Sequence, residues 1–536
     1  MSATDPARPT APGPAQASSA PGGPPFPAER PAVPSRTDGA AHSQPDGPTH
    51  PGVEGPALLA ADSPGSVPAP RLAASRARGL GPSRTDGSEA APAGGRQPGD
   101  PHLEAGPFDL VVRSRRVVLP GGERALAVAV RDGVIAALLP YDAEASAAER
   151  VDLGQVCLLP GLVDSHVHVN EPGRTHWEGF ATATRAAAAG GVTTIIDMPL
   201  NSLPPTVDVA ALAVKRAAAA GKCAVDVGFW GGAIPGNAAE LRPLHEAGVY
   251  GFKCFLSPSG VEEFPPLDET GLRAAMRELA AFDGLMVVHA EDPALLTDPV
   301  GPTYRQFLDS RPGEAERRAV ERVIAAARDT GARAHILHVS AAACLEPLEA
   351  AQRDGVRVSA ETCPHYLTLT AGQVRGPEFK CCPPIRDEGN RDELWQGLAA
   401  GVLTCVVSDH SPSTPDLKTP DFATAWGGIS SLQVGLPAIW TEARERGHPL
   451  TRVTEWMARG PAALAGLPAK GRIAVGADAD LVAFDDTAAF TVDAAELRHR
   501  NPLTPYHGRT LTGVVGATWL RGRPVTDSTP PFGALL

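Results

Sequence analysis

The chain has 536 residues, 20% of them charged, and a formal net charge of −13, which argues against nucleic-acid binding because such proteins present a basic surface. It has no run of 18 apolar residues and no apolar signal-peptide core, and its eight cysteines lack the paired spacing of a disulfide framework. We therefore expect a cytoplasmic protein with reduced thiols, and neither nucleic acid nor a membrane as its partner.

Residues 1–105 differ in composition from the rest of the chain. They are dominated by Pro, Ala, Gly, Ser and Asp, have Phe26 as their only aromatic residue, and carry the hexapeptide Pro-Ser-Arg-Thr-Asp-Gly at both 34–39 and 82–87. Such a segment buries too little apolar surface to offset the entropy of ordering it, so we predict a disordered tail. A functional tail and a start codon assigned too far upstream are the alternatives.

Strand-like segments occur at both ends of the remaining chain. Runs of β-forming residues bounded by turn residues lie at 108–119, 125–139, 471–482 and 514–525. The most economical arrangement is one small β-sandwich domain, built from residues 106–160 at one end and residues 471–536 at the other.

Residues 161–470 lie between these ends and alternate between two patterns. Short apolar β-forming runs are followed by Ala- and Glu-rich stretches of helical character, such as 272–282 and 314–330. This alternation predicts repeated βα units. We expect an α/β protein whose main domain is a (β/α)8 TIM-like barrel, in which functional residues lie at the C-terminal ends of the strands.

Five metal-capable segments adjoin these predicted strands. They contain His166 with His168, Lys253, His289, His338 and Asp409. In a strand, residues i and i+2 point the same way, so the first two histidines can reach one cation together. Taken singly, a histidine in an apolar strand is more often a core residue, the lysine a strand-end residue and the aspartate a turn residue. The ordered set of five predicts a metal site at the mouth of the barrel.

Several longer motifs carry a family resemblance. They are the His166-Val167-His168 pair followed by Glu171-Pro172-Gly173-Arg174, the run Lys253 to Val261, Glu361-Thr362-Cys363-Pro364-His365-Tyr366-Leu367, Pro383-Pro384-Ile385-Arg386, and Ser408-Asp409-His410-Ser411-Pro412. Together they resemble the cyclic amidohydrolases, and most closely the allantoinase family within that group. The resemblance covers nearly everything after residue 106.

This resemblance implies a binuclear zinc site and a homotetramer. One zinc ion would be held by His166, His168 and Asp409 and the other by His289 and His338. The side chain of Lys253 would bridge the two ions as a carboxylated lysine, since an ammonium has no lone pair to offer a metal. The resemblance also makes Asp409 the catalytic general base, which moves a proton from the attacking water to the leaving ring nitrogen.

The residues expected to bind substrate are less specific than the metal ligands. They are Asn170, which stands where dihydroorotases have an arginine, Ser259, Cys382, Gly427 and Gly428. Hydantoinases have a tyrosine where this chain has Pro258, and the hydroxyl of Ser259 could replace it or could simply stabilise a turn. By position, the other three match loops that present backbone groups to a cyclic ureide.

The expected function is the zinc-dependent opening of the hydantoin ring of allantoin to give allantoate, in purine degradation and nitrogen salvage. Another enzyme of the group, a hydantoinase or dihydropyrimidinase, is the first alternative. A non-catalytic scaffold protein on the same fold is the second. Such scaffolds usually lose metal ligands, whereas all six are present here.

Overall fold

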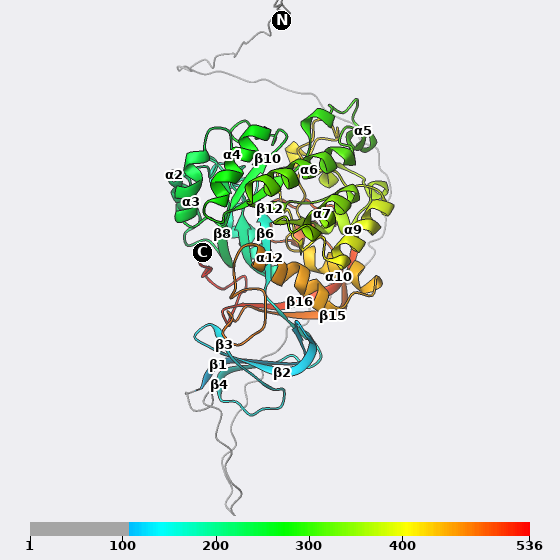
Figure 1. The fold of residues 1–536 in the computed structure, drawn as a ribbon. Helices are drawn as coiled ribbons and strands as arrows, with labels where there is room; N and C mark the ends of the chain where they lie inside the picture. The colour runs from blue at the N-terminus through cyan, green and yellow to red at the C-terminus, as the bar shows by residue number, and fades with distance from the viewer. Residues whose placement is uncertain (1–106) are drawn as a thin grey trace, which may run out of the picture. The chain divides into compact units, whose positions relative to one another are not determined.

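The computed structural model describes residues 107–536, so the tail predicted for residues 1–105 lies outside the described residues. The described chain forms a barrel of parallel strands surrounded by helices, and a further sheet that combines strands from both ends of this region (Figure 1). The fold predicted from the sequence, an α/β barrel with a β domain built from both ends, is confirmed. No helix within residues 107–536 is long and apolar enough to cross a membrane.

The β domain is one hydrogen-bonded sheet in the order β17-β16-β15-β5-β1-β2-β3, with β4 paired to β1. Its strands are β1 (Phe108–Leu119), β2 (Gly122–Arg131), β3 (Val134–Pro140), β4 (Ala147–Asp152), β5 (Cys157–Pro160), β15 (Leu481–Thr491), β16 (Thr510–Leu520) and β17 (Arg523–Pro524). The two halves meet where β15 pairs antiparallel with β5. Leu110, Leu158, Leu481 and Trp519 are buried in one shared apolar core, which explains why both ends are needed.

One predicted strand is shorter than the sequence suggested. The prediction of strand over 471–482 is wrong for residues 471–480, because β15 begins only at Leu481. Gly471 and Gly476 have φ of +70° and +83°, which a strand cannot contain. The segment contacts the sheet through an isolated bridge from Asp478 to Val134 and a few backbone hydrogen bonds, such as those between Ile135 and residues 476 and 477.

The barrel consists of parallel strands that follow one another in chain order. They are β6 (Leu162–Val167), β7 (Val192–Asp197), β8 (Asp226–Phe229), β9 (Gly231–Gly232), β10 (Phe252–Phe255), β11 (Leu285–His289), β12 (Arg333–Ile336), β13 (Val358–Thr362) and β14 (Cys405–Val406). Trp230 alone separates β8 from β9, so these two form one interrupted strand. Beyond β14 the chain pairs with β6 through a parallel bridge between His410 and Val167, which closes the barrel.

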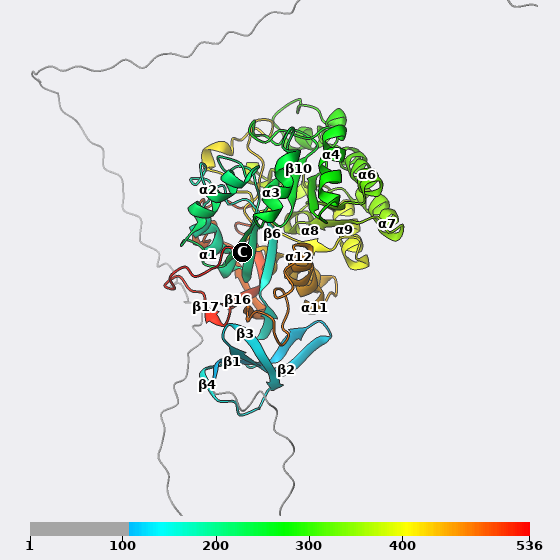
Figure 2. The same ribbon diagram turned by 60° about the vertical axis from the view of Figure 1, so that its left-hand side comes forward.

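Helices cover the outside of the barrel (Figure 2). They are α1 (Phe180–Ala189), α2 (Val209–Ala219), α3 (Leu241–Glu246), α4 (Glu269–Ala280), α5 (Tyr304–Asp309), α6 (Gly313–Thr330), α7 (Leu345–Arg353), α8 (Pro364–Thr368), α9 (Glu388–Ala400), α10 (Gly435–Glu445), α11 (Leu450–Thr454) and α12 (Gly460–Leu464). In α4 the cap is Asp268, and the apolar residues at positions i, i+3, i+4 and i+7 from Leu272 are buried. We propose that the barrel begins and ends where the sequence places it, at 161 and 470, since β5 ends at Pro160.

A buried lysine joins the β domain to the barrel. The Nζ atom of Lys470 lies 2.7 Å from a carboxylate oxygen of Asp226 in β8, 2.7 Å from one of Asp478 and 2.9 Å from one of Asp480. Burial opposes the charge on Lys470, but the attraction of Asp480 and Asp226 outweighs it and raises the pKa of this lysine. The ammonium therefore stabilises carboxylates that belong to both domains.

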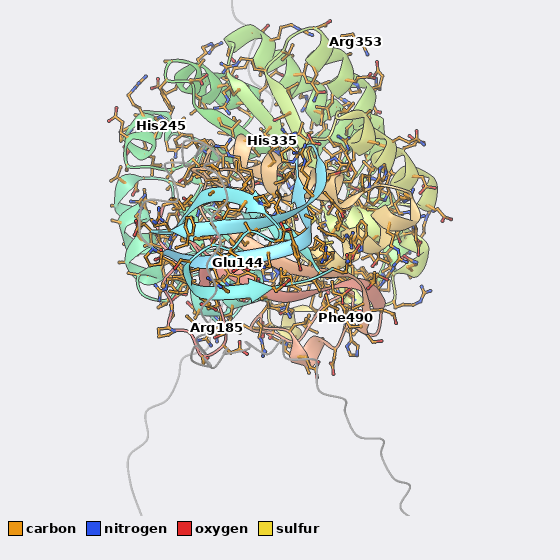
Figure 3. All side chains as sticks on the ribbon, turned by 90° about the horizontal axis from the view of Figure 1, so that it is seen from below. Glu144, Arg185, His245, His335, Arg353 and Phe490 are labelled. Carbon is orange, nitrogen blue, oxygen red and sulfur yellow. The ribbon has the colours of Figure 1, made fainter. Side chains whose placement is uncertain are left out.

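Replacing this lysine should destabilise the folded chain strongly. In Lys470→Met the buried carboxylates lose their shared cation, and we expect the free energy of unfolding to fall by on the order of 3 kcal/mol. The matched control is Arg353→Met, whose residue lies at the outer rim of the helices (Figure 3) and forms an exposed ion pair with Glu349. That pair should contribute less than about 1 kcal/mol. Equal losses in the two variants, measured by chemical denaturation, would contradict the anchoring role.

Candidate metal centre

The six predicted metal ligands surround one cavity of about 240 Å³ at the C-terminal ends of the barrel strands. They are His166 in β6, His168 directly after it, Lys253 in β10, His289 at the end of β11, His338 after β12 and Asp409 after β14. Parallel strands of a barrel end at one face, so residues far apart in the sequence meet here.

The donor atoms of these side chains have the spacing of metal ligands. Oδ1 of Asp409 lies 3.2 Å from Nε2 of His166 and 3.5 Å from Nε2 of His168. Nδ1 of His289 lies 3.1 Å from Nε2 of His338. Two ligands of a tetrahedral zinc ion, each about 2.0 to 2.1 Å from the metal, are separated by roughly 3.3 Å. The two sets therefore fit the ions to which the resemblance assigns them.

The two sets also adjoin each other. Donor atoms of His166, His338 and Asp409 all lie within 4.8 Å of one another, although these residues belong to different predicted sets. The rings of His166 and His338 are 5.4 Å apart between their centroids. The donor side chains therefore form one continuous cluster and not two separate ones.

The protonation state of the histidines suits metal binding. Burial lowers the pKa of His166, His289 and His338 below the usual value for histidine. Neutral imidazole is the form that offers a lone pair to a metal. Nε2 of His166 is buried and has no hydrogen-bond partner among the described residues. An unpartnered buried nitrogen costs free energy unless a ligand satisfies it.

Two buried glutamates orient the histidine rings from behind. Oε1 of Glu361 lies 2.6 Å from Nδ1 of His166, and Oε2 of Glu291 lies 2.8 Å from Nε2 of His289. Each carboxylate accepts the proton of one ring nitrogen, which leaves the opposite nitrogen free to face the cavity. Glu361 begins one of the sequence motifs, but its contact with His166 spans 195 residues and is not visible in the sequence.

The glutamates are themselves held by charged or polar neighbours. Nε2 of His335 lies 3.0 Å from Oε2 of Glu361. Arg311, which lines the cavity, donates to Glu291 over 3.1 Å. Burial alone would raise the pKa of Glu291, but the charge of Arg311 and the hydrogen bond from His289 lower it to about 2. This glutamate is thus ionised, and a fixed carboxylate keeps its histidine in one orientation.

Lys253 differs from the other five side chains because its ammonium form has no lone pair for a metal. It is 1% exposed, its Nζ lies 4.4 Å from the ring centre of Phe255, and no carboxylate of residues 107–536 forms an ion pair with it. Burial lowers its pKa to about 8. A neutral amine is therefore accessible near neutral pH at a position facing the donor atoms of the other five.

The backbone at the site is held in an uncommon conformation. Asn170, Asn201, His338 and Asp409 have positive φ, between 37° and 65°, which is disfavoured for residues other than glycine. Such strain costs on the order of 1 to 3 kcal/mol for each residue and persists only where the surroundings enforce it. Four of the seven such residues in the described chain thus lie at or beside this cavity.

The predicted substrate contacts are only partly brought together. Ser259, Cys382, Gly427 and Gly428 line the cavity, whereas Asn170 does not. The hydroxyl of Ser259 donates to the carbonyl of Phe264 over 2.6 Å, so it is occupied within its own loop.

Asn170 is buried beside the site rather than exposed to the cavity. Its Nδ2 donates to the carbonyl of Pro412 over 3.3 Å, and its Oδ1 is buried without a partner among residues 107–536.

Two cavity residues were not predicted as substrate contacts. Asn201, in the loop after β7, lines the cavity, and its side-chain amide forms no hydrogen bond within the described residues. Trp426 also lines the cavity, and its ring lies 5.1 Å from that of Trp177. The position of Asn201 just beyond a barrel strand is the one signal that the sequence contained, because such loops form the active-site face.

Known proteins resemble most of the chain. Residues 157–525 match the model of the amidohydrolase family. The allantoinase of Streptomyces avermitilis is 59% identical over 437 residues, covering 80% of this chain and 98% of that protein. The allantoinase of Saccharomyces cerevisiae is 45% identical over 382 residues, covering 69% and 82%. The structure of L-hydantoinase from Arthrobacter aurescens is 32% identical with a TM-score of 0.76, covering 80% and 97%.

These likenesses agree with the barrel and with the cluster of donor side chains at its mouth. The chain belongs to the amidohydrolase family. Within that family it is an allantoinase-like enzyme, a hydrolase acting on cyclic amides.

Adding one methyl group to the cavity wall should reduce activity strongly without unfolding the protein. At Gly428, which has φ of +138°, a Cβ atom would lie 2.1 Å from the carbonyl oxygen of Ser411. Gly428→Ala should therefore displace this loop, and a displacement of about 1 Å can reduce the rate about 100-fold. Gly121→Ala is the control, because no atom lies within 4 Å of its added Cβ. Wild-type kcat/KM in Gly428→Ala would show that the loop does not contribute to the site.

Proposed function

We propose that this enzyme hydrolyses the cyclic amide bond of allantoin to give allantoate, in purine degradation and nitrogen salvage, with two zinc ions per chain. The observation that carries the proposal is the meeting of all six donor side chains at one cavity, in a chain 59% identical to an allantoinase. The resemblance implies a homotetramer that acts on a small cyclic ureide, and the sequence favours the cytoplasm as its location.

The residues that would hold the ions are the two sets described above, together with Lys253. Its neutral Nζ attacks carbon dioxide and loses a proton, which gives a carbamate with one negative charge and two oxygen donors. When bound, zinc polarises a carbonyl and lowers the pKa of a coordinated water to about 7. The donor set of imidazole nitrogens and carboxylate oxygens suits zinc.

Asp409 has the position that a proton carrier needs. Its Oδ1 faces His166 and His168, and its side chain is 11% exposed towards the cavity that it lines. It accepts the proton of the attacking water as the new carbon–oxygen bond forms. It then returns this proton to the ring nitrogen, which takes the electron pair of the breaking carbon–nitrogen bond. The product is a ring-opened carboxylate.

The charge distribution around the cavity favours an uncharged substrate. The guanidinium of Arg311 is already paired with Glu291, so it is not free to bind the carboxylate of dihydroorotate. The ureido arm of allantoin needs neutral donors and acceptors instead. The unpartnered amide of Asn201 provides both, and we favour it over Asn170, whose Nδ2 is engaged by Pro412.

A hydantoinase is the second candidate, supported by the likeness to the Arthrobacter enzyme at a TM-score of 0.76. The cavity offers no tyrosine of the kind that hydantoinases use, since Pro258 and Ser259 line that part of the wall. Plain hydantoin would also leave the amide of Asn201 without a partner, which penalises binding.

A substrate panel separates the two candidates. We expect kcat/KM for allantoin to exceed that for hydantoin, dihydrouracil and dihydroorotate by at least about 100-fold, because a polar subsite discriminates against substrates that leave it unpaired. Zinc content should be measured on the same sample. Faster opening of hydantoin or dihydrouracil would assign the enzyme to the second candidate and leave the metal proposal standing.

The carbamate has a direct test at Lys253. Lys253→Ala should lose most of its bound metal and activity, because neither set of ligands is bridged, and a short carboxylate such as formate should partly restore both. Lys253→Arg is the matched control, since its side chain fills the space and cannot carry carbon dioxide. Recovery of metal and activity in Lys253→Arg on addition of formate would contradict a bridging carbamate. Full metal content in Lys253→Ala would contradict it as well.

A further inference from the structure

One loop of the cavity wall is held in place from its outer side by two lysines. This loop, called the roof loop below, consists of Ala425, Trp426, Gly427 and Gly428, and all four residues line the cavity. The ring of Trp426 packs against Trp177, with ring centroids 5.1 Å apart, which fixes one end of the loop. Lys380 and Lys418 hold the other residues of the loop.

The ammonium groups donate to the carbonyls of the roof loop. Nζ of Lys380 lies 2.6 Å from the carbonyl oxygen of Ala425. Nζ of Lys418 lies 2.9 Å from that of Trp426 and 2.6 Å from that of Gly428. Neither lysine forms an ion pair with a carboxylate among residues 107–536. Burial lowers the pKa of both, to about 8 for Lys418.

Placing two cations, of which Lys380 is buried and Lys418 partly buried, against carbonyls without a carboxylate partner costs free energy, which the ring of Phe307, 4.9 Å from Nζ of Lys380, offsets only in part. Lys380 is only 6% exposed, so water does not compensate for its burial. A loop that merely needed its carbonyls satisfied could be served by neutral donors. The arrangement therefore points to a role for the loop itself.

The backbone groups of the roof loop are almost all engaged. The amides of Ala425, Trp426 and Gly428 donate to the carbonyls of Asp421, Leu417 and Lys380, each over 2.8 Å. With the three carbonyls taken by the lysines, only the amide and the carbonyl of Gly427 form no hydrogen bond within the described residues. The loop thus offers a ligand one donor and one acceptor from the same residue.

The hydrogen bonds of the neighbouring groups make the free amide of Gly427 a stronger donor and its free carbonyl a stronger acceptor. The amide of Gly427 belongs to the same peptide unit as the carbonyl of Trp426, which accepts a bond from the ammonium of Lys418. A cation at one end of a peptide unit polarises it and makes the amide at the other end a stronger donor. The carbonyl of Gly427 shares its peptide unit with the amide of Gly428. Because this amide donates to the backbone carbonyl of Lys380, the carbonyl of Gly427 becomes a stronger acceptor.

We propose that Lys418 and Lys380 are positioning residues that hold the roof loop for the ring of the substrate, and that the ammonium of Lys418 also polarises the Gly427 amide. The amide of Gly427 donates to a ring carbonyl, on which negative charge grows as water attacks, and the carbonyl of Gly427 accepts from a ring N–H. Fixed donors aimed at a developing charge lower the barrier. This inference rests on the proposed opening of a cyclic ureide. It predicts that the two lysines affect contacts with the ring of the substrate and not those with the ureido arm.

The test compares variants of these lysines in the full-length, zinc-loaded enzyme. Lys418→Met removes the charge and both bonds, Lys380→Met removes one bond, and Lys418→Arg keeps a cation with several donors. Arg375→Met is the control, because this exposed arginine also donates to loop carbonyls, those of Gly372 and Val374, away from the cavity. The measurements are kcat and KM for allantoin and for hydantoin, zinc content and thermal midpoint.

We expect kcat/KM in Lys418→Met to fall at least about 10-fold, mainly through kcat, by the same factor for both substrates and with zinc content unchanged. Lys418→Arg should recover part of the loss, Lys380→Met should show a smaller loss, and Arg375→Met should match wild type. Unchanged kcat, a loss confined to allantoin, or a loss that follows zinc content would overturn the proposal. If Lys418→Met does not fold, Lys418→Gln and Lys380→Met give the same comparison.

A failure of the proposed function is recognised separately in this experiment. Wild-type enzyme that opens hydantoin but not allantoin would contradict the allantoin assignment, while the lysine variants could still be compared on hydantoin. Wild-type opening of allantoin with unchanged lysine variants would contradict the positioning role alone.

Discussion

Four buried histidines, one lysine and one aspartate face one another around a cavity, and three of the ring nitrogens, Nε2 of His166, Nδ1 of His168 and Nδ1 of His338, have no hydrogen-bond partner within residues 107–536. Polar atoms removed from water cost free energy unless they are bonded, so this cluster is unfavourable as an end in itself. The surrounding fold stabilises it nonetheless. Barrel strands bring the side chains to one face, two glutamates fix the ring orientations, and positive φ at His338 and Asp409 aims those residues inward. Divalent metal ions are the ligands that would best satisfy the polar atoms of this cluster.

Four lysines with buried or partly buried side chains have three different environments. Lys470 is surrounded by three carboxylates and joins two domains, which is a structural use. The ammonium groups of Lys380 and Lys418 donate to loop carbonyls behind the cavity wall and have no carboxylate partner among residues 107–536. Nζ of Lys253 has neither kind of partner and lies 4.4 Å from the ring centre of Phe255. These lysines therefore differ in the partners of the ammonium more than in its burial.

The sequence was sufficient for the barrel and for the set of side chains that meet at its mouth. Strand-like runs alternating with helical stretches, together with the i, i+2 spacing of His166 and His168, indicate both without any tertiary information. The segment 471–480 was predicted wrongly, because its composition is strand-like while its glycines adopt positive φ. Contacts that depend on folding were not visible either. The support of His166 by Glu361 and the free amide of Asn201 follow from the packing of distant loops.

The central claim is that these side chains hold two zinc ions bridged by a carboxylated lysine. X-ray diffraction from crystals of the isolated enzyme, recorded on both sides of the zinc absorption edge, tests it most directly. The account predicts two anomalous peaks in the cavity about 3.5 to 4 Å apart, with planar carboxylate density on Nζ of Lys253 between them. A single peak, or an unmodified lysine side chain beside two ions, would contradict it.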